Sequence, residues 1–146
     1  MELLKFNQEL NINTKPCQSY IVATEYLWGT DARKVLDLVT EPDCKGFDLV
    51  IGCDIVYDAA LITPLIESIK ALSNENTVVL MTIDESIDRP DEIKSFHEEC
   101  KMHGLVKENI DASELHPQYV RNSVQMFTLK TKEIPAAQVQ KPSKIR

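Results

Sequence analysis

Apolar and polar positions follow one another along this chain in patterns that predict helices and strands in turn. Apolar residues at spacings of three and four predict helices at residues 2–11, 61–72 and 90–103, and a short helix is expected at residues 30–41. Runs rich in β-branched and aromatic residues predict strands at residues 20–27, 47–53, 76–83, 105–110 and 123–129. Since helices and strands alternate, we expect an α/β fold with a mostly parallel sheet. The last two strands lack a helical crossover between them and should pair antiparallel at one edge.

The strand predicted at residues 47–53 points to a binding site. Five of its seven residues are apolar, and a short run of this kind is typical of a strand that is buried on both faces of a parallel sheet. Asp54 follows the strand at once, and Tyr57 lies three residues further on. In open α/β sheets ligands bind beyond the carboxyl ends of the strands, so we expect these two side chains at such a site.

The net charge of −7 is unevenly distributed along the chain. Residues 130–146 carry +4 and residues 1–129 carry −11. An acidic body repels phosphate backbones, which disfavours nucleic acid as a partner and favours a basic, lysine-bearing protein or peptide. The acidity could equally serve solubility. The prolines, alanines and scattered lysines near the end predict a flexible basic tail at residues 131–146, after one α/β domain at residues 1–130.

Composition also bears on the cellular setting and on metals. The four cysteines form no C-x-x-C pair, which predicts a reduced, intracellular protein. No apolar segment approaches the length of about 18 residues that a membrane span needs, and the first residues do not resemble a signal peptide. We therefore expect a protein of the cytoplasm or the nucleus that has no membrane partner. His97 and His103 do not share a helix face, so no metal site is expected.

Three short stretches carry a family resemblance: L-W-G at residues 27–29, D-L-V-I-G-C-D-I-V-Y at residues 48–57, and E-L-H-P-Q-Y at residues 114–119. The second contains a D-x-x-Y signature directly after a strand. Together they resemble the class I, seven-strand S-adenosylmethionine-dependent methyltransferases and, more narrowly, the family 16 protein-lysine methyltransferases (the methyltransferase-like 21 group). The third stretch resembles the family member that acts on the AAA ATPase valosin-containing protein.

The resemblance implies a Rossmann-like seven-strand fold and an enzyme that methylates a lysine of a protein substrate, such as a chaperone or an AAA ATPase. S-adenosyl-L-methionine would be the cofactor, with Trp28 against its adenine ring and Cys53 in contact with it. Asp54 and Tyr57 would form the mouth of the channel that admits the lysine. A free lysine has a pKa of about 10.4 and must lose its proton before attack, so Asp54 is expected to orient the ammonium group rather than to act as a strong base. Tyr57 offers a ring face to the cation and a hydroxyl for alignment.

The chain departs from the family at the cofactor site. No two of its four glycines lie close enough to form the family's glycine-rich turn of E-x-G-x-G type. The acidic residue that would hold the ribose is missing too, and residues 2–13 resemble the helix that follows it. We therefore expect an N-terminally truncated fold that covers the later two-thirds of the domain and binds the cofactor weakly or not at all. The strand at residues 47–53 would then have an unpaired apolar edge, and residues 20–27 would be cut off from it.

Other interpretations of the same residues stay open. A truncated gene model, an isoform, or half of a site completed by another chain would each account for the missing turn. Trp28 could be a core or interface residue, and Asp54 and Tyr57 could be a helix cap region and a packed aromatic ring. The alternative function is a catalytically inactive interaction module with the same fold. A methyltransferase for small molecules is a third candidate, which the D-x-x-Y run disfavours.

Overall fold

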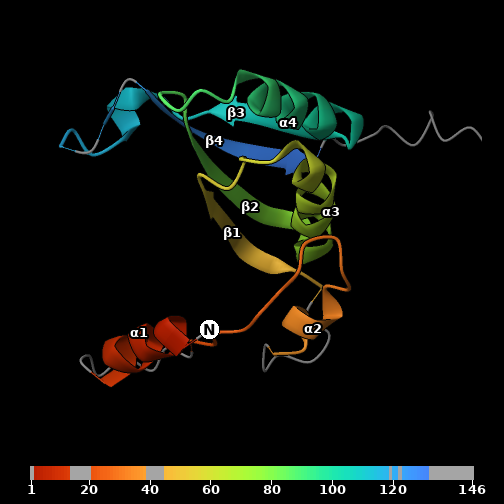
Figure 1. Cartoon of the computed structure of the whole chain (residues 1–146), viewed down its shortest axis with the longest axis vertical. Coiled ribbons are helices and arrows are strands. Elements are labelled where there is room, and N and C mark those ends of the chain that lie inside the picture. Colours follow the sequence, from red (N-terminus) through yellow and green to blue (C-terminus); the bar gives the residue numbers. More distant parts are fainter. Residues whose placement is uncertain (1, 14–20, 39–44, 119, 122, 132–146) are drawn as a thin grey trace, which may run out of the picture.

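The computed structural model describes residues 2–13, 21–38, 45–118, 120–121 and 123–131. Its centre is a four-stranded sheet with two helices packed on one face (Figure 1). In chain order the helices and strands are α1 (Glu2–Asn13), α2 (Arg33–Leu36), β1 (Phe47–Cys53), α3 (Ile62–Leu72), β2 (Ser73–Asp84), α4 (Pro90–Met102), β3 (Leu105–Asn109) and β4 (Val124–Thr131). Two short 3₁₀ turns, Ala59–Leu61 and Ala112–Glu114, come before α3 and after β3.

The sheet has the strand order β1-β2-β4-β3. β1 and β2 run parallel and are joined through α3, which is the right kind of connection for a parallel pair. β4 is antiparallel to both β2 and β3. The expected antiparallel pairing of the last two strands is therefore confirmed, and so is the α/β class. Only one of the three strand pairs in the described sheet is parallel, so this sheet is mixed rather than mostly parallel.

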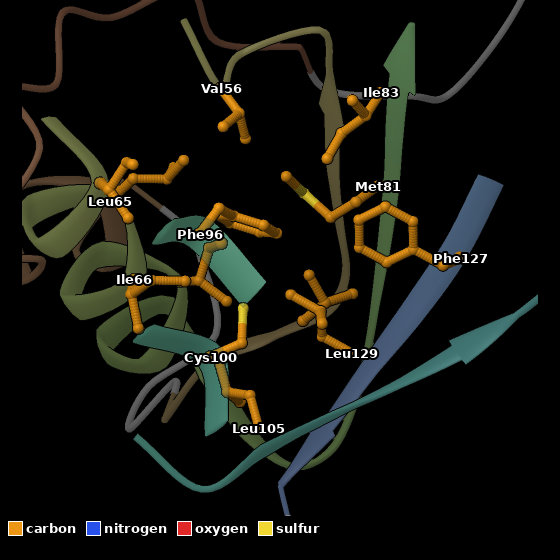
Figure 2. Packing of buried hydrophobic residues seen from close by; sticks show 13 residues of the cluster. Val56, Leu65, Ile66, Met81, Ile83, Phe96, Cys100, Leu105, Phe127 and Leu129 are labelled. Carbon is orange, nitrogen blue, oxygen red and sulfur yellow. The ribbon is translucent and has the colours of Figure 1, made fainter. Parts of the chain in front are cut away.

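The hydrophobic core lies between the sheet and the helices α3 and α4. It is formed by apolar side chains that alternate along β2 and β4 and by one face of each helix (Figure 2). The rings of Phe96 on α4 and Phe127 on β4 lie 6.3 Å apart, centroid to centroid, at the middle of this layer. The largest fully buried side chains are Phe96, Phe127, Ile66, Met81, Ile83, Leu129 and Val56.

Both core helices begin where the sequence provides a start signal. Before α3, the Asp58 carboxylate accepts a hydrogen bond from Ala60 N and caps the 3₁₀ turn that leads into the helix. α4 starts at Pro90, whose fixed φ angle suits a first helical position, and Asp91 and Glu92 complement the positive end of the helix dipole. The predicted helices at 61–72 and 90–103 are thus confirmed to within a residue or two.

The strand predicted at residues 20–27 is wrong for the residues that the structure describes. Residues 21–27 form no strand. Their backbone is held by a side chain instead: Gln8 on α1 donates to Ile21 O (2.6 Å) and accepts from Ala23 N (3.2 Å). A strand needs a hydrogen-bonded neighbour as well as β-branched residues. In the described sheet β1 pairs with β2 on one side, and residues 21–27 do not pair with its other edge. The expected unpaired edge of residues 47–53 is therefore confirmed.

The expectation that residues 47–53 are buried on both faces is also wrong. Leu49 and Ile51 of β1 are 50% and 66% exposed. They point away from α3 and α4 and lie beside Val78 and Leu80 of β2, on the face of the sheet that neither helix covers. The apolar composition of β1 suits a strand that is covered on both faces of the sheet. In this structure helices cover one face, and the other face is exposed. Of the predicted tail at 131–146, Thr131 ends β4, and residues 132–146 lie outside the described part of the chain.

Candidate functional site

The predicted site lies where β1 and β2 end. The two parallel strands end at the same edge of the sheet, and Asp54 N donates to Thr82 O at 3.0 Å across this edge. Asp54 has a positive φ angle of 52°. Among the described residues, no other residue apart from glycines has a positive φ angle. Aspartate tolerates this left-handed conformation better than most residues, and the turn directs the chain away from β2 toward α3.

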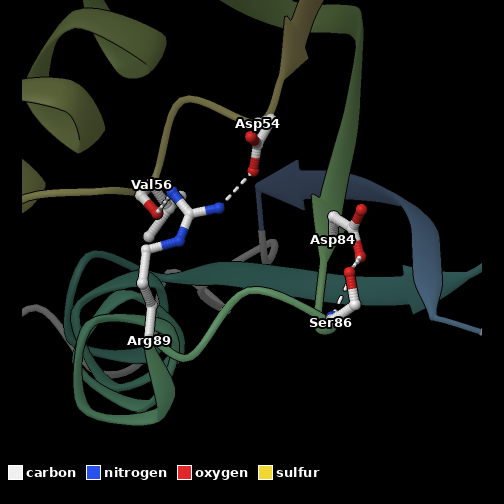
Figure 3. Close-up of polar contacts among 5 residues, drawn as sticks. All are labelled: Asp54, Val56, Asp84, Ser86 and Arg89. Carbon is white, nitrogen blue, oxygen red and sulfur yellow. Dashed lines mark hydrogen bonds and ion pairs between the residues drawn. The ribbon is translucent and has the colours of Figure 1, made fainter.

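The carboxylate of Asp54 is held by Arg89, which comes from the loop between β2 and α4 (Figure 3). The guanidinium donates from Nη2 to Asp54 Oδ1 at 2.5 Å and from Nη1 to Val56 O at 2.9 Å. The side chain of Arg89 is 13% exposed, whereas that of Asp54 is 42% exposed. A nearly buried cation thus fixes a carboxylate that still faces solvent.

Trp28 and Tyr57, two further residues of the predicted site, lie side by side. Their ring centroids are 6.4 Å apart, and the ring planes are inclined at 48°. Trp28 is half-buried against the hydrophobic core, and Tyr57 is 53% exposed. The two rings therefore form an aromatic wall that is open on the side of Tyr57.

Gly29 and Ser68 hold Trp28 in this position. Gly29 N donates to Ser68 Oγ on α3 at 2.8 Å, and the same hydroxyl donates to Pro64 O at 2.8 Å. Gly29 has a φ angle of 77°, and a Cβ atom added there would lie 3.2 Å from Pro64 Cβ. Glycine is required at this position both for the backbone conformation and for the close approach to α3.

Cys53 is exposed at the end of β1. It follows Gly52, whose Cβ position faces Met81 of the core, so the Cys53 side chain points toward the uncovered face of the sheet. Trp28 packs on the covered side. The structure brings Trp28 together with Tyr57 and Asp54 together with Arg89, whereas the two predicted cofactor contacts, Trp28 and Cys53, lie toward different faces.

Trp28 and Cys53 suit contacts to S-adenosylmethionine individually, but they lie toward different faces of the sheet. Trp28 offers a partly exposed indole for an adenine ring, and Cys53 is small enough to lie beside a bound cofactor. Gly29 and Gly52 are committed to packing against Pro64 and Met81, and the sequence has no paired glycines for a turn around the rest of the cofactor. The described residues thus include an indole that suits an adenine ring and no glycine-rich turn that suits the rest of the cofactor.

A second polar group lies beside a cavity of about 560 Å³, and Glu85 and His97 of this group line the cavity together with Arg89. Lys107 Nζ donates to Gln125 Oε1 at 2.6 Å and lies 3.5 Å from His97 Nε2, and Gln125 in turn donates to Glu85. Burial lowers the pKa of His97, and the charges of Lys107 and Lys101 lower it further. Burial also lowers the pKa of Lys107. At neutral pH, His97 is therefore uncharged.

Arg89 was not among the residues predicted for the site. The run at residues 84–88 is acidic, and its composition alone indicates a solvated loop at the carboxyl end of a strand. The available signal was that Arg89 is the one cation next to these acids, directly before the proline that starts α4. Residues 114–118 of the predicted stretch lie in the connection from β3 to β4, the far end of which is tied to the end of β2 by a hydrogen bond from Glu85 N to Ser123 O at 2.7 Å; residue 119 is outside the described part.

In the part of the chain that the structure describes, no three His, Cys, Asp or Glu side chains are arranged to hold a metal ion. None of the described helices is long and apolar enough to cross a lipid bilayer.

Comparison with protein-family models matches residues 1–103 to the lysine methyltransferase family. Comparison with curated proteins finds no match. The matched region covers more than half of the chain and ends just after α4, so it contains Trp28, Cys53, Asp54, Tyr57 and Arg89. The chain belongs to the lysine methyltransferase family.

Proposed function

We propose that this chain carries the lysine-recognising part of an S-adenosylmethionine-dependent protein-lysine methyltransferase. The observation that supports this is the position of Asp54 and Tyr57. Both side chains are exposed just beyond the carboxyl end of β1, within the region that matches the family. Ligands of open α/β sheets bind at this edge.

In this proposal Asp54 receives the amino group of the target lysine and fixes its direction. The ring of Tyr57, which lies beside Trp28, lines the alkyl part of the side chain and offers a π face to the ammonium group. The cofactor, when bound, supplies an electrophilic methyl group on a sulfonium sulfur. The protein's own contribution is to hold an uncharged amine in line with that methyl group, because correct positioning alone lowers such a barrier greatly.

Trp28 and Cys53 are the proposed contacts to the cofactor, with Trp28 against the adenine ring. Because the sequence has no glycine pair for the other side, we expect this chain alone to bind the cofactor weakly or not at all. The acidic net charge of residues 1–129 favours a substrate whose lysine lies in a basic segment. A chaperone or an AAA ATPase in the cytoplasm or nucleus is the kind of substrate that we propose from the family resemblance.

The test starts with calorimetric titration of the full chain with S-adenosylmethionine. It continues with transfer of labelled methyl groups to a mixture of proteins, read as methyl-lysine by mass spectrometry. Asp54→Asn and Tyr57→Phe should each reduce incorporation, by about 100-fold for Asp54→Asn if positioning is its role. Ser113→Ala, in an exposed turn far from Asp54 in the sequence, is the control. Equal incorporation by Asp54→Asn and the parent chain would refute the assignment.

A second candidate is a catalytically inactive interaction module of the same fold. It is favoured by the uncovered apolar side chains of Leu49, Ile51 and Val78, which are unusual on a free surface. Because the leading proposal already expects weak cofactor binding, the result that favours this candidate is absence of methyl transfer even at a large excess of S-adenosylmethionine.

A further inference from the structure

Arg89 joins two points of the segment that carries the proposed lysine site. One terminal nitrogen of its guanidinium binds the Asp54 side chain, and the other binds the backbone oxygen of Val56 (Figure 3). The contact spans 35 positions of the sequence. Because the arginine is nearly buried and held at both nitrogens, its charge is fixed beside the carboxylate.

This arrangement matters for a lysine that has to become neutral. A lone carboxylate stabilises the ammonium form of a nearby lysine and raises its pKa. Such a site would bind the substrate well but keep it protonated and unable to attack. A second cation on the same carboxylate has the opposite effect, because it offsets the negative charge that favours the ammonium form.

We propose that Arg89 is a positioning residue that acts through Asp54, so that the site accepts the target lysine as a neutral amine. This inference rests on the proposed function. The lysine ammonium group releases its proton to solvent water on entering the site, and the neutral nitrogen is then held by the Asp54 carboxylate. The clamp on Val56 keeps that carboxylate in one orientation.

The other charged groups around the pair are engaged elsewhere or lie in the neighbouring cavity. Asp58 caps the 3₁₀ turn, Asp84 accepts two hydrogen bonds from Ser86, and Glu85 accepts one from Gln125. The remaining titratable groups near Arg89 line the 560 Å³ cavity: Asp88, Lys94, His97, Glu98 and Lys101. Among the described contacts, the Asp54 carboxylate is bound by Arg89.

The experiment compares the affinities of the full chain for a charged and a neutral analogue of the lysine side chain. Butylammonium is the charged probe at neutral pH, and 1-butanol is the neutral one of similar size. Trp28 is the sole tryptophan and lies beside Tyr57, so its fluorescence reports binding of either probe. Ionic strength is held constant with sodium chloride, since exposed charges are screened by salt.

Arg89→Met should tighten butylammonium binding by about tenfold and leave 1-butanol binding unchanged, because the Asp54 carboxylate then has no paired cation to offset its charge. Arg89→Gln removes the charge but keeps a polar amide on a shorter side chain and should behave in the same way, which covers the case in which Arg89→Met does not fold. Arg89→Lys keeps the charge and should retain the parent selectivity. Lys94→Met removes a charge from the same cavity and is the matched control, with an expected change of less than about twofold.

A double-mutant cycle decides whether Arg89 acts through Asp54. In the Asp54→Asn background the Arg89→Gln change should alter the ratio of the two affinities by less than about twofold. An unchanged ratio in Arg89→Gln, or an equal effect in the Asp54→Asn background, would overturn the inference while leaving the lysine site in place. If neither probe changes the fluorescence of any variant, the lysine site itself is refuted and this inference falls with it.

Discussion

Replacing Ser68 by alanine should loosen the turn that carries Trp28. The Ser68 hydroxyl is buried on α3 and accepts a hydrogen bond from Gly29 N at 2.8 Å. Without it, the Gly29 N–H loses its partner within the protein. Gly29 itself is exposed, so water can replace part of the interaction, and we expect a loss of about 1 kcal/mol in the free energy of unfolding.

Urea denaturation followed by circular dichroism measures this loss, and Trp28 fluorescence measures the local effect. The emission of Trp28 should shift to longer wavelength in Ser68→Ala, because the indole moves away from the core that now half-buries it. Ser113→Ala removes an exposed hydroxyl that donates to Asp111 at 2.6 Å, so it serves as the control with a loss below about 0.5 kcal/mol. Equal stability of the two variants, with unchanged Trp28 emission, would show that Ser68 does not anchor the turn.

Three further predictions test the core, the uncovered face and the pH response. Phe96→Ala should reduce the free energy of unfolding by about 3–5 kcal/mol, because its ring is fully buried, whereas Phe6→Ala on α1 should change it by less than about 0.5 kcal/mol. Ile51→Thr on the uncovered face should lower the free energy of unfolding by less than about 0.5 kcal/mol, and Ile83→Thr in the core should lower it by about 1–3 kcal/mol. Similar losses for the two variants in urea denaturation would refute the exposure of Ile51. His97 has a lowered pKa in the folded chain, so the unfolded chain binds its proton more readily and stability falls as the pH drops below about 6.5. His97→Gln should weaken that fall between pH 7.5 and 5.5 in urea titrations, and an unchanged slope would contradict the assignment.

The elements that the sequence predicted well are those whose apolar spacing reflects burial. Ile66 and Ile69 on α3, and Phe96 and Cys100 on α4, recur at helical spacing because they all face the core. Tertiary packing and local pattern agree there. The fold class and the two core helices follow from such positions.

Residues 21–27 show where a local pattern is insufficient. Their β-branched and aromatic residues favour an extended backbone, but a strand also needs the hydrogen bonds of a neighbour. In the structure Gln8 on α1 takes the place of a neighbour for Ile21 and Ala23. No property of residues 21–27 themselves could have revealed this contact.

The positions of the site residues were predictable to different degrees. Asp54 and Tyr57 are fixed by the end of β1, so their place at the edge of the sheet follows once that strand is recognised. The contact between Trp28 and Tyr57 depends instead on how Gly29 is tied to α3. Sequence spacing does not encode that packing.

The acidic run at residues 84–88 explains how Arg89 reaches Asp54. Asp84 accepts hydrogen bonds from the backbone N and the hydroxyl of Ser86 at 2.9 and 2.7 Å, which turns the chain sharply after β2 and lowers the pKa of Asp84. Glu85 N donates to Ser123 O and ties the same turn to the segment before β4. Pro90 then fixes the start of α4. The acidic composition of this loop indicates that it is solvated, but the acids also shape it. The loop in turn places Arg89 on the carboxylate of the proposed lysine site. The loop geometry, more than the identity of Asp54 alone, therefore sets the charge that an incoming lysine would meet.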